Sequence, residues 1–219
     1  MSTLYAGSHR ALQDAFGTRR MADLNEESDL KNEIPERERV FIETRDMFFL
    51  STVDERGRPT VSYKGGDPGF IKVPDPKTLI FPSYDGNGMF LSMGNIARSA
   101  EVGLLFIDFE KPRRLRLQGS AEISAEPDLL ANWADADLAV RVRVTDLWIN
   151  CPRYVHRYEK VKASRYVPRT GEQTPLAEWK RIEELQDGLR DHERREVEKR
   201  GTITEAEWLA RIDAGSEDV

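Results

Sequence analysis

Between Met47 and Asn150 the sequence repeatedly alternates short β-forming segments with turn residues, and this pattern restricts the possible folds more than any other feature. The segments are rich in β-branched and aromatic residues, as strands are. They cover residues 47–53, 59–63, 69–73, 78–82, 102–109, 114–123 and 139–150. Because no β-α-β repeat occurs, the pattern predicts a mainly β barrel or sandwich, and a doubly wound sheet is not expected.

Helical patterns precede and interrupt this β-rich region. Residues 8–16 are predicted to form a short helix that Ser8 caps, and residues 21–34 an arm or long loop. Pro35 opens a predicted helix that reaches Arg45, because proline is tolerated in a first helical turn. Two more short helices are predicted inside the β-rich region, over 89–98 and 127–133.

From Pro168 the character of the chain changes. Residues 176–199 are strongly charged and carry an apolar stripe at helical spacing, which predicts one helix, and Thr204 opens a last helix. The predicted organisation is an N-terminal arm with a short helix (1–34), a β domain (35–167) and a charged helical C-terminal extension (168–219).

Composition narrows the class of protein. The chain has 219 residues, 33% of them charged, and a formal net charge of −6, which argues against a general nucleic-acid binder. No apolar run is long enough to span a membrane, and the first residues lack the basic and apolar regions of a signal peptide. The single cysteine, Cys151, fits a reducing compartment. The expected location is therefore the cytoplasm, with neither nucleic acid nor membrane as a partner.

Common catalytic and metal-binding motifs are missing from the sequence. His9, His156, His192 and Cys151 do not have the spacing of a zinc site, so no metal is predicted. Cys151 lacks a recognisable nucleophile motif, and no glycine-rich dinucleotide or Walker loop occurs. The sequence therefore identifies no catalytic residue. A bound phosphate would have to be held by groups other than those of a dinucleotide or Walker loop.

One candidate phosphate-binding segment is the turn from Pro82 to Gly88, which lies between a predicted strand and a predicted helix. Gly86 and Gly88 flank Asn87, so the backbone can adopt positive φ and its N–H groups can approach an anion. The alternative is an ordinary turn without a ligand. A second segment, Ser62 to Gly66, ends an earlier strand and offers a hydroxyl group, a cation and exposed backbone.

Cationic side chains on the predicted strands could also bind a phosphate. Lys64, Arg113, Arg114 and Arg116 lie at strand ends or on one strand face. Arginine gives bidentate bonds to phosphate, whereas lysine gives a point charge. The alternative is a solvated face on which these arginines pair with Glu110 and Glu122.

Taken together, these segments resemble the pyridoxamine 5′-phosphate oxidase-like, FMN-binding split-barrel family. The resemblance runs from about Arg37 to Ile123, with weaker support to His156, and depends on the order and spacing of short motifs. The motifs are residues 49–59, 61–66, 81–88, 92–96, 102–106 and 113–119.

The resemblance implies a six-stranded split β-barrel with flanking helices, a homodimer, and FMN at the dimer interface. The strand end at residues 62–64 is implied to contact the flavin ring and phosphate, and the turn at 81–88 to cradle them. Asn95 is implied for the phosphate or ribityl chain, and Arg113 and Arg114 for contact from the second subunit. The full predicted cofactor set is Ser62, Tyr63, Lys64, Phe81, Pro82, Ser83, Tyr84, Gly86, Asn87, Gly88, Asn95, Arg113 and Arg114.

Two departures from the family pattern affect the predicted reaction more than the predicted cofactor. Gly86-Asn87-Gly88 replaces the basic pair that true pyridoxamine-phosphate oxidases carry in the phosphate turn, and their C-terminal tryptophan–arginine motif has no counterpart. The prediction is an FMN-dependent oxidoreductase that moves a hydride or electrons to or from an unidentified small molecule. Two alternatives remain: a non-catalytic protein of the same fold that holds flavin, deazaflavin or haem, and a scaffold whose helical tail binds a partner.

Overall fold

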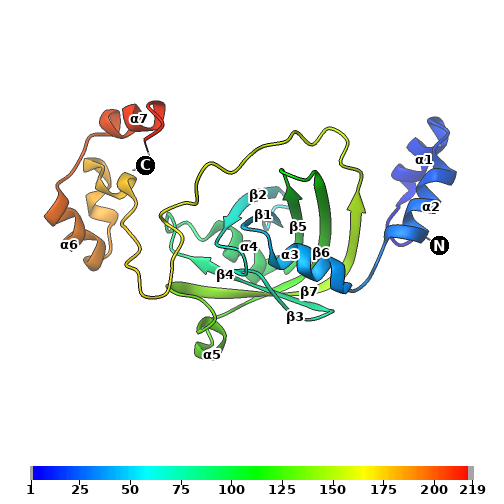
Figure 1. Cartoon of the computed structure of the whole chain (residues 1–219), viewed down its shortest axis with the longest axis horizontal. Coiled ribbons are helices and arrows are strands. Elements are labelled where there is room, and N and C mark those ends of the chain that lie inside the picture. Colours follow the sequence, from blue (N-terminus) through cyan, green and yellow to red (C-terminus); the bar gives the residue numbers. More distant parts are fainter. Residues whose placement is uncertain (1, 217–219) are drawn as a thin grey trace. The chain divides into compact units, whose positions relative to one another are not determined.

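The computed structural model describes residues 2–216, so the last three residues of the predicted extension lie outside it. Contacts divide the chain into two compact units, of which the first ends at Lys162 and the second begins at Ala163. Figure 1 shows the strands gathered in the first unit and only helices and loops in the second.

The first unit is built on one antiparallel sheet with the strand order β2-β1-β5-β6-β7-β4-β3. The strands are β1 (Met47–Val53), β2 (Pro59–Gly65), β3 (Lys72–Asp75), β4 (Thr78–Tyr84), β5 (Glu101–Asp108), β6 (Arg113–Ser124) and β7 (Ala136–Asn150). The mainly β architecture is thereby confirmed. The predicted count of six strands in a split barrel is corrected, because the short strand β3 adds a seventh beyond β4. The ladder of described strands runs from β2 to β3 without closing.

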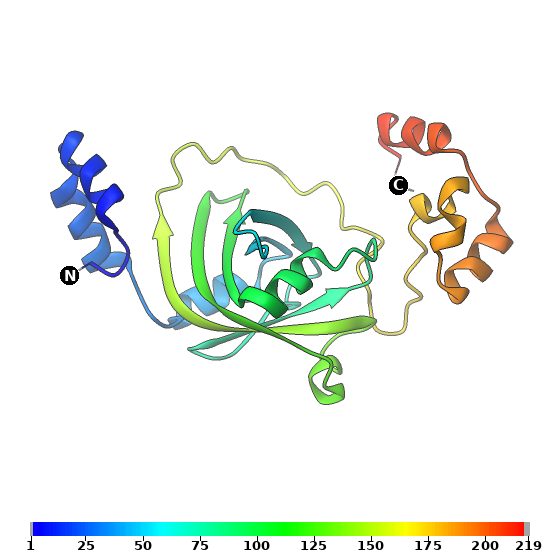
Figure 2. The same cartoon turned by 180° about the vertical axis from the view of Figure 1, so that it is seen from behind.

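The sheet rolls up because only one of its faces is apolar throughout. Side chains alternate along each strand, and the inward positions of β1, β5 and β6 are buried while their neighbours are not. The ring of Phe48 on β1 lies 5.0 Å from that of Phe81 on β4, although three strands separate β1 from β4 in the ladder. Such a contact requires a curved sheet, which Figure 2 shows from behind.

Two helices complete the core inside the curve. Phe41 and Ile42 come from α3 (Glu36–Glu43), and Met93 and Ile96 come from α4 (Leu91–Ser99). Figure 2 shows α4 lying within the curve of the sheet. The core thus holds α4 against the inner faces of the strands, which fixes where its first turn lies.

The two long strands β6 and β7 bend together at Gly119. The register between them shifts between Gln118 and Gly119, as in a β-bulge. A Cβ atom on Gly119 would lie 2.4 Å from the backbone oxygen of Arg143. Glycine is therefore required here by the close approach of the β7 backbone.

The N-terminal region contains two helices, α1 (Gly7–Ala15) and α2 (Arg19–Asp29). The arm or long loop predicted over 21–34 was therefore wrong for residues 21–29. Pairing between the helices explains the difference: Arg10 on α1 forms an ion pair of 2.6 Å with Asp23 on α2, and the hydroxyl of Tyr5 donates to the carbonyl of Ala22 at 3.4 Å. These contacts join distant positions that no local apolar pattern reveals.

The second unit contains two 3₁₀ turns, η1 (Glu178–Arg181) and η2 (Glu183–Gly188), followed by α6 (Asp191–Arg200) and α7 (Glu205–Asp213). The single helix predicted over 176–199 is thereby corrected. Ile182 and Leu189 adopt extended backbone conformations, and Ile182 forms a parallel bridge with Ile203. A residue that pairs in this way cannot continue a helix, so the segment breaks on either side of η2.

Buried ion pairs stabilise this second unit. The carboxylate of Glu178 is 1% exposed and accepts hydrogen bonds from Arg181, Arg200 and Arg211. The buried side chains of Lys180 and Glu193 form an ion pair of 2.5 Å. In neither unit does a helix of residues 2–216 have the length and apolar character needed to cross a membrane.

We expect Gly119→Ala to lower the free energy of unfolding of the first unit by about 1–3 kcal/mol, because the new methyl group forces the β7 backbone to move. Chemical denaturation followed by tryptophan fluorescence measures this. Gly94→Ala is the control, since a Cβ atom at this helical position meets no atom within 4 Å. Equal stability of the two variants would contradict the close approach at Gly119.

Acid should destabilise the second unit through Glu193. Burial opposes ionisation of this carboxyl, but hydrogen bonds from Arg190 and Lys180 outweigh burial and lower its pKa to about 2. A lowered pKa stabilises the fold above the ordinary value of 4.5, and this stability is lost as the pH falls from there toward about 2. The protection factors of the amide hydrogens of residues 178–200, which compare the observed exchange with the intrinsic rate at each pH, should fall over that range.

The Glu193→Gln variant tests this assignment. It should exchange faster than the natural protein at pH 7 and show less acid dependence, because the charge is gone at every pH. Glu198→Gln on the exposed side of the same helix is the matched control. If both variants exchange alike, Glu193 does not carry the acid sensitivity.

Candidate functional site

The predicted site begins on β2, which lies at one edge of the sheet and, among the strands that the structure describes, pairs with β1 alone. Ser62 and Lys64 lie opposite Leu50 and Phe48, whose side chains are fully buried. Because side chains alternate along a strand, Ser62 and Lys64 share the inward face of β2, and Tyr63 lies on its outward face. The alternation thus splits the three predicted residues between two faces.

A hydrogen bond joins this inward face to the first turn of α4. The hydroxyl oxygens of Ser62 and Ser92 are 2.7 Å apart, and either can be the donor. Ser92 is 6% exposed. The sequence-based prediction did not include Ser92, although its position in the first turn of the helix after the glycine turn was a usable signal.

The first turn of α4 has no side-chain cap. The residue before it, Phe90, has the left-handed φ of 47°, which is unfavourable for a bulky side chain. The N-cap residue Phe90 provides no side-chain cap, and the first turn holds no acidic residue. Uncapped N–H groups at a helix N-terminus are suited to bind an anion.

The glycine turn itself is held by Asn87. The side-chain oxygen of Asn87 accepts a hydrogen bond of 3.1 Å from the N–H of Met89, and Gly88 has a φ of 75°. This is the geometry of an ordinary asparagine turn. The side chain of Asn87 therefore shapes the turn, and the backbone that follows it leads directly into the N-terminus of α4.

Lys64 lies on the inward face of β2, two residues beyond the contact between Ser62 and Ser92. Its side chain is half-buried, and burial lowers the pKa of its ammonium group. Within residues 2–216, the ammonium group of Lys64 forms no ion pair with a carboxylate and no hydrogen bond with a carbonyl. A cation that is partly desolvated without a counter-charge gains stability from an anionic ligand.

The residues of β4 divide at the end of the strand. Phe81 and Pro82 are buried. Phe81 is 0% exposed and Phe70 is 5% exposed, so both rings lie in the core and neither is open to a ligand. Ser83 and Tyr84 follow and are half-buried. Burial, with a smaller contribution from the charge of Asp67, raises the pKa of Tyr84 to about 12. Tyr84 thus stays protonated and is the aromatic side chain of this set that remains accessible.

Asn95 lies deeper than predicted. It is 8% exposed, and its amide nitrogen donates hydrogen bonds of 3.0 Å to Thr52 and 3.4 Å to Thr60. These bonds tie α4 to β1 and β2 on the inward side. In this structure the amide therefore positions α4, and the phosphate or ribityl contact implied for it stays a prediction.

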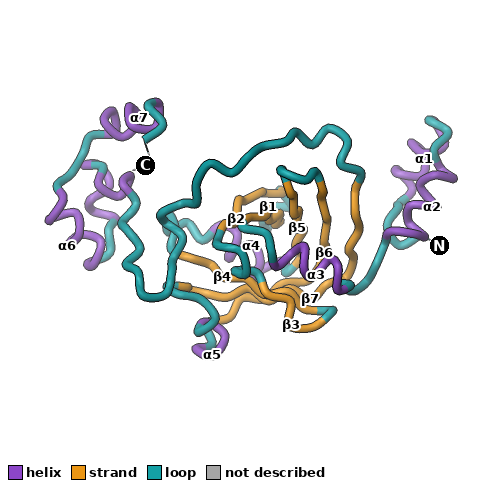
Figure 3. Tube along the Cα trace, in the orientation of Figure 1, coloured by secondary structure: helices purple, strands orange, loops and turns teal. Residues whose placement is uncertain are grey.

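Tyr63 belongs to the outward face of the sheet. It is 63% exposed, and its ring meets that of Phe49 edge to face at 6.2 Å. Burial and then the charge of Asp46 raise its pKa. Asp46 in turn binds Lys160 at 2.6 Å, on the loop after β7 that Figure 3 shows as a continuous teal segment.

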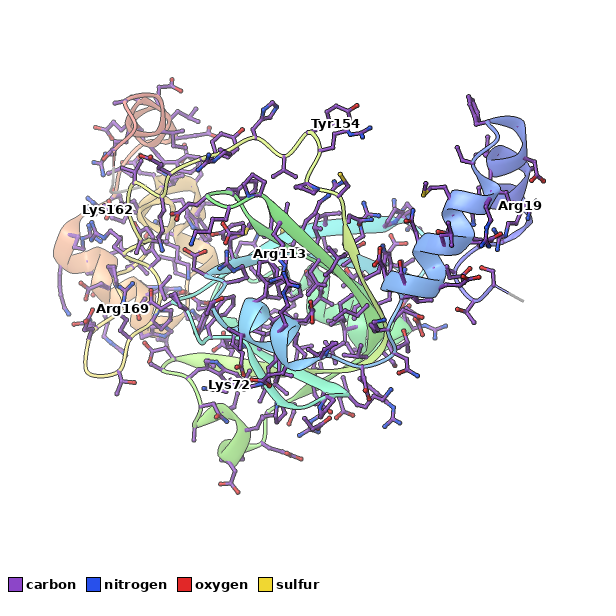
Figure 4. All side chains as sticks on the ribbon, turned by 45° about the vertical axis from the view of Figure 1, so that its right-hand side comes forward. Arg19, Lys72, Arg113, Tyr154, Lys162 and Arg169 are labelled. Atoms are coloured by element: carbon purple, nitrogen blue, oxygen red, sulfur yellow. The ribbon has the colours of Figure 1, made fainter. Side chains whose placement is uncertain are left out.

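Arg113 and Arg114 lie at the start of β6, three strands away from β2 in the ladder. At the usual strand spacing this is about 14 Å from the Lys64 end of the site, with which the start of β6 is level. Arg113 forms an ion pair of 2.9 Å with Glu38 on α3, and its guanidinium lies 4.3 Å from the ring centre of Phe41 (Figure 4). Arg114 donates from Nε to the carbonyl of Cys151 at 3.0 Å, and its other N–H groups make no such bond among the described residues.

The structure therefore brings Ser62 together with the first turn of α4 and places Lys64 two residues farther along the same face of β2. It leaves Arg113 and Arg114 elsewhere in the same chain. The described residues contain no group of three or more His, Cys, Asp or Glu side chains that could hold a metal ion. What the site offers is a cation, hydroxyl groups and uncapped backbone N–H groups, which is the chemistry of an anion site.

The family model for pyridoxamine 5′-phosphate oxidase matches residues 34–146. The chain belongs to this family. The match contains every strand of the sheet up to the middle of β7, the joint between Ser62 and Ser92, and Lys64. The family assignment predicted from the motif order is thereby confirmed.

Solved structures of similar fold include three from bacteria. HupZ of Group A Streptococcus is 17% identical, covers 57% of this chain and 99% of its own, and has a TM-score of 0.44. An FMN-binding protein from Syntrophomonas wolfei is 12% identical, with coverages of 64% and 97% and a TM-score of 0.42. The haem storage protein HutZ from Vibrio cholerae is 17% identical, with coverages of 53% and 94% and a TM-score of 0.39. No curated protein matches the chain.

Asn95→Ala should lower the free energy of unfolding by about 1–3 kcal/mol, because buried hydroxyl groups lose their hydrogen-bond donor. Urea denaturation measures the loss. Asn87→Ala, in the exposed turn, is the matched control and should change stability by less than half as much. A neutral Asn95→Ala variant would show that the amide does not position α4.

Proposed function

We propose that this member of the family is an FMN-binding flavoprotein of the split-barrel type that acts as an oxidoreductase. The observation that carries the proposal is the hydrogen bond of 2.7 Å between Ser62 and Ser92, which places the inward face of β2 against the uncapped first turn of α4. Lys64 lies two residues farther along the same face. These groups would hold the phosphate of FMN.

The hydroxyl pair suits a phosphate for a simple reason. A serine hydroxyl has one proton to donate, and only one of the two serines donates in the bond between them. The other hydroxyl keeps its proton for an acceptor outside the pair. Together with the N–H groups of α4 and the ammonium group of Lys64, it presents donors and positive charge to one place.

The flavin ring needs an aromatic or apolar wall and donors near its polar edge. Tyr84 is the accessible aromatic side chain at the end of β4, and Ser83 beside it is half-buried. When bound, FMN would supply the transfer of a hydride or of electrons. The residues of this chain would bind and orient the flavin, and no side chain is assigned as an acid or base.

A second copy of the chain would complete the site. Lys64 and Arg114 lie at about three strand spacings from one another in one chain, too far to grip the same phosphate or ring edge. The free N–H groups of Arg114 could instead reach the flavin of a partner chain, whereas Arg113 is already bound to Glu38. We therefore propose a homodimer with the flavin at its interface.

A non-catalytic flavin carrier is the second candidate. It is favoured by the turn at Gly86–Gly88, where Asn87 serves the backbone and no basic side chain reaches out for a substrate. Turnover of a reduced nicotinamide cofactor by the FMN-loaded protein, with a quinone as acceptor, decides between the two. Steady oxidation of the nicotinamide would exclude the pure carrier.

Lys64→Met should raise the Kd for FMN about 10- to 150-fold, as expected for the loss of a charged hydrogen bond. Quenching of flavin fluorescence during titration measures the Kd. Lys111→Met, in the exposed turn between β5 and β6, is the control and should leave it unchanged. If the natural protein gains no flavin absorbance when FMN is added, the proposed cofactor is wrong; if only Lys64→Met has no effect, the phosphate lies elsewhere.

A further inference from the structure

The helical hairpin formed by α1 and α2 buries none of its residues. Its exposed apolar side chains form what we call the hairpin face: Leu12 (61% exposed), Phe16 (78%), Met21 (61%) and Leu24 (41%). The two helices have 9 and 11 residues, and helices shorter than about 12–15 residues are marginal in water unless an apolar face packs against something. The hairpin face therefore needs a surface to cover it.

Polar contacts already occupy the other side of the hairpin. Arg10 pairs with Asp23 at 2.6 Å, and Glu26 accepts a hydrogen bond of 2.8 Å from the hydroxyl of Ser2. These bonds hold α1 and α2 together as one piece. The hairpin is joined to the sheet by Lys31, whose N–H and carbonyl both bond Leu147 at 2.8 Å.

A matching surface exists on the outward side of the sheet. Register places five side chains in one line across five strands, which we call the outer row: Tyr63, Phe49, Leu105, Arg116 and Trp148. The row is aromatic and apolar except for Arg116, which is exposed. Tyr63 is 63% exposed, and its neighbour Val61 on the same face is 69% exposed.

The hairpin face and the outer row match in spacing and charge. On α2, Met21, Leu24 and Glu27 follow one another at intervals of three residues, about 4.5 Å apart along the axis, close to the strand spacing of about 4.8 Å. A helix laid across the strands would thus set its apolar side chains over Phe49 and Leu105 and its acidic one over Arg116. Neither Glu27 nor Arg116 has an ion-pair partner within residues 2–216.

We propose that the hairpin is an exchanged arm, whose face docks on the outer row of a second copy of this chain. The proposal rests on the homodimer of the proposed function, because the outer row includes Tyr63, next to the site residues Ser62 and Lys64. Exchange about a two-fold axis covers both hairpin faces at once, and it leaves no apolar face open to form longer assemblies. Each arm then covers the outward side of the strands whose inward side carries its partner's site residues.

Cross-linking between two single-cysteine proteins tests the exchange. In a Cys151→Ser background, one protein carries Glu27→Cys and the other carries Arg116→Cys. After mixing and mild oxidation, we expect a disulfide that joins the two different chains, identified by mass spectrometry of the linked peptides. A mixture of Glu27→Cys with Glu126→Cys, an exposed position beyond the end of β6, is the control and should not cross-link.

A double variant with both cysteines in one chain separates exchange from fold-back onto the chain's own sheet. A disulfide within single chains, with none in the mixture, would overturn the proposal, and so would the absence of any disulfide. The dimer dissociation constant from sedimentation should also rise about tenfold or more for Met21→Asp, as for loss of a central apolar contact. It should not rise for Ala11→Asp, an exposed position of α1 that points away from Leu12 and Phe16. An unchanged constant for Met21→Asp would count against the arm.

These readouts do not depend on flavin. If the chains cross-link but bind no FMN, the proposed exchange of the hairpin is supported and the proposed cofactor is wrong. If FMN binds and no disulfide forms between the cysteines introduced at positions 27 and 116, the proposed exchange of the hairpin is wrong and the proposed function stands.

Discussion

The structure depends on the burial of one face of a single antiparallel sheet. Apolar side chains alternate along the strands, so the sheet must either pack against a second layer or roll up on itself. It rolls, and the contact between Phe48 on β1 and Phe81 on β4 joins strands that lie far apart in the ladder. Gly119 makes this possible, because its missing Cβ lets β6 and β7 bend together where their register shifts.

The same roll determines where chemistry can occur. It encloses α4 and holds the first turn of this helix against the edge strand β2, where Ser62 meets Ser92. Asn95 supports the arrangement from behind, since its amide is tied to Thr52 and Thr60. The half-buried Lys64 lies two residues farther along the same face of β2 and has no counter-charge among the described residues, so this corner of the fold favours an anion. The proposed flavin site is thus a consequence of how the core closes.

The fold could be predicted wherever the signal was local. Alternating side chains located most strands, because the inward positions of β1, β5 and β6 are apolar in sequence and buried in structure. Local patterns failed where a distant partner decided the conformation. Ile182 was predicted helical from its place in an apolar stripe, but its bridge to Ile203 keeps it extended. The polar helix α2 was missed because α1 stabilises it through ion pairs.

For the site, the sequence by itself determined which segments carry polar and cationic groups beside glycine turns, and their order was sufficient to indicate the family. Only the tertiary structure decided which of these groups meet. Ser92 was brought to Ser62, Phe81 was placed in the core, and Arg113 was bound by Glu38. The physical reason is that strand alternation and helix periodicity are encoded within a few residues. Which strand end faces which helix end depends instead on how the whole sheet curls around its core.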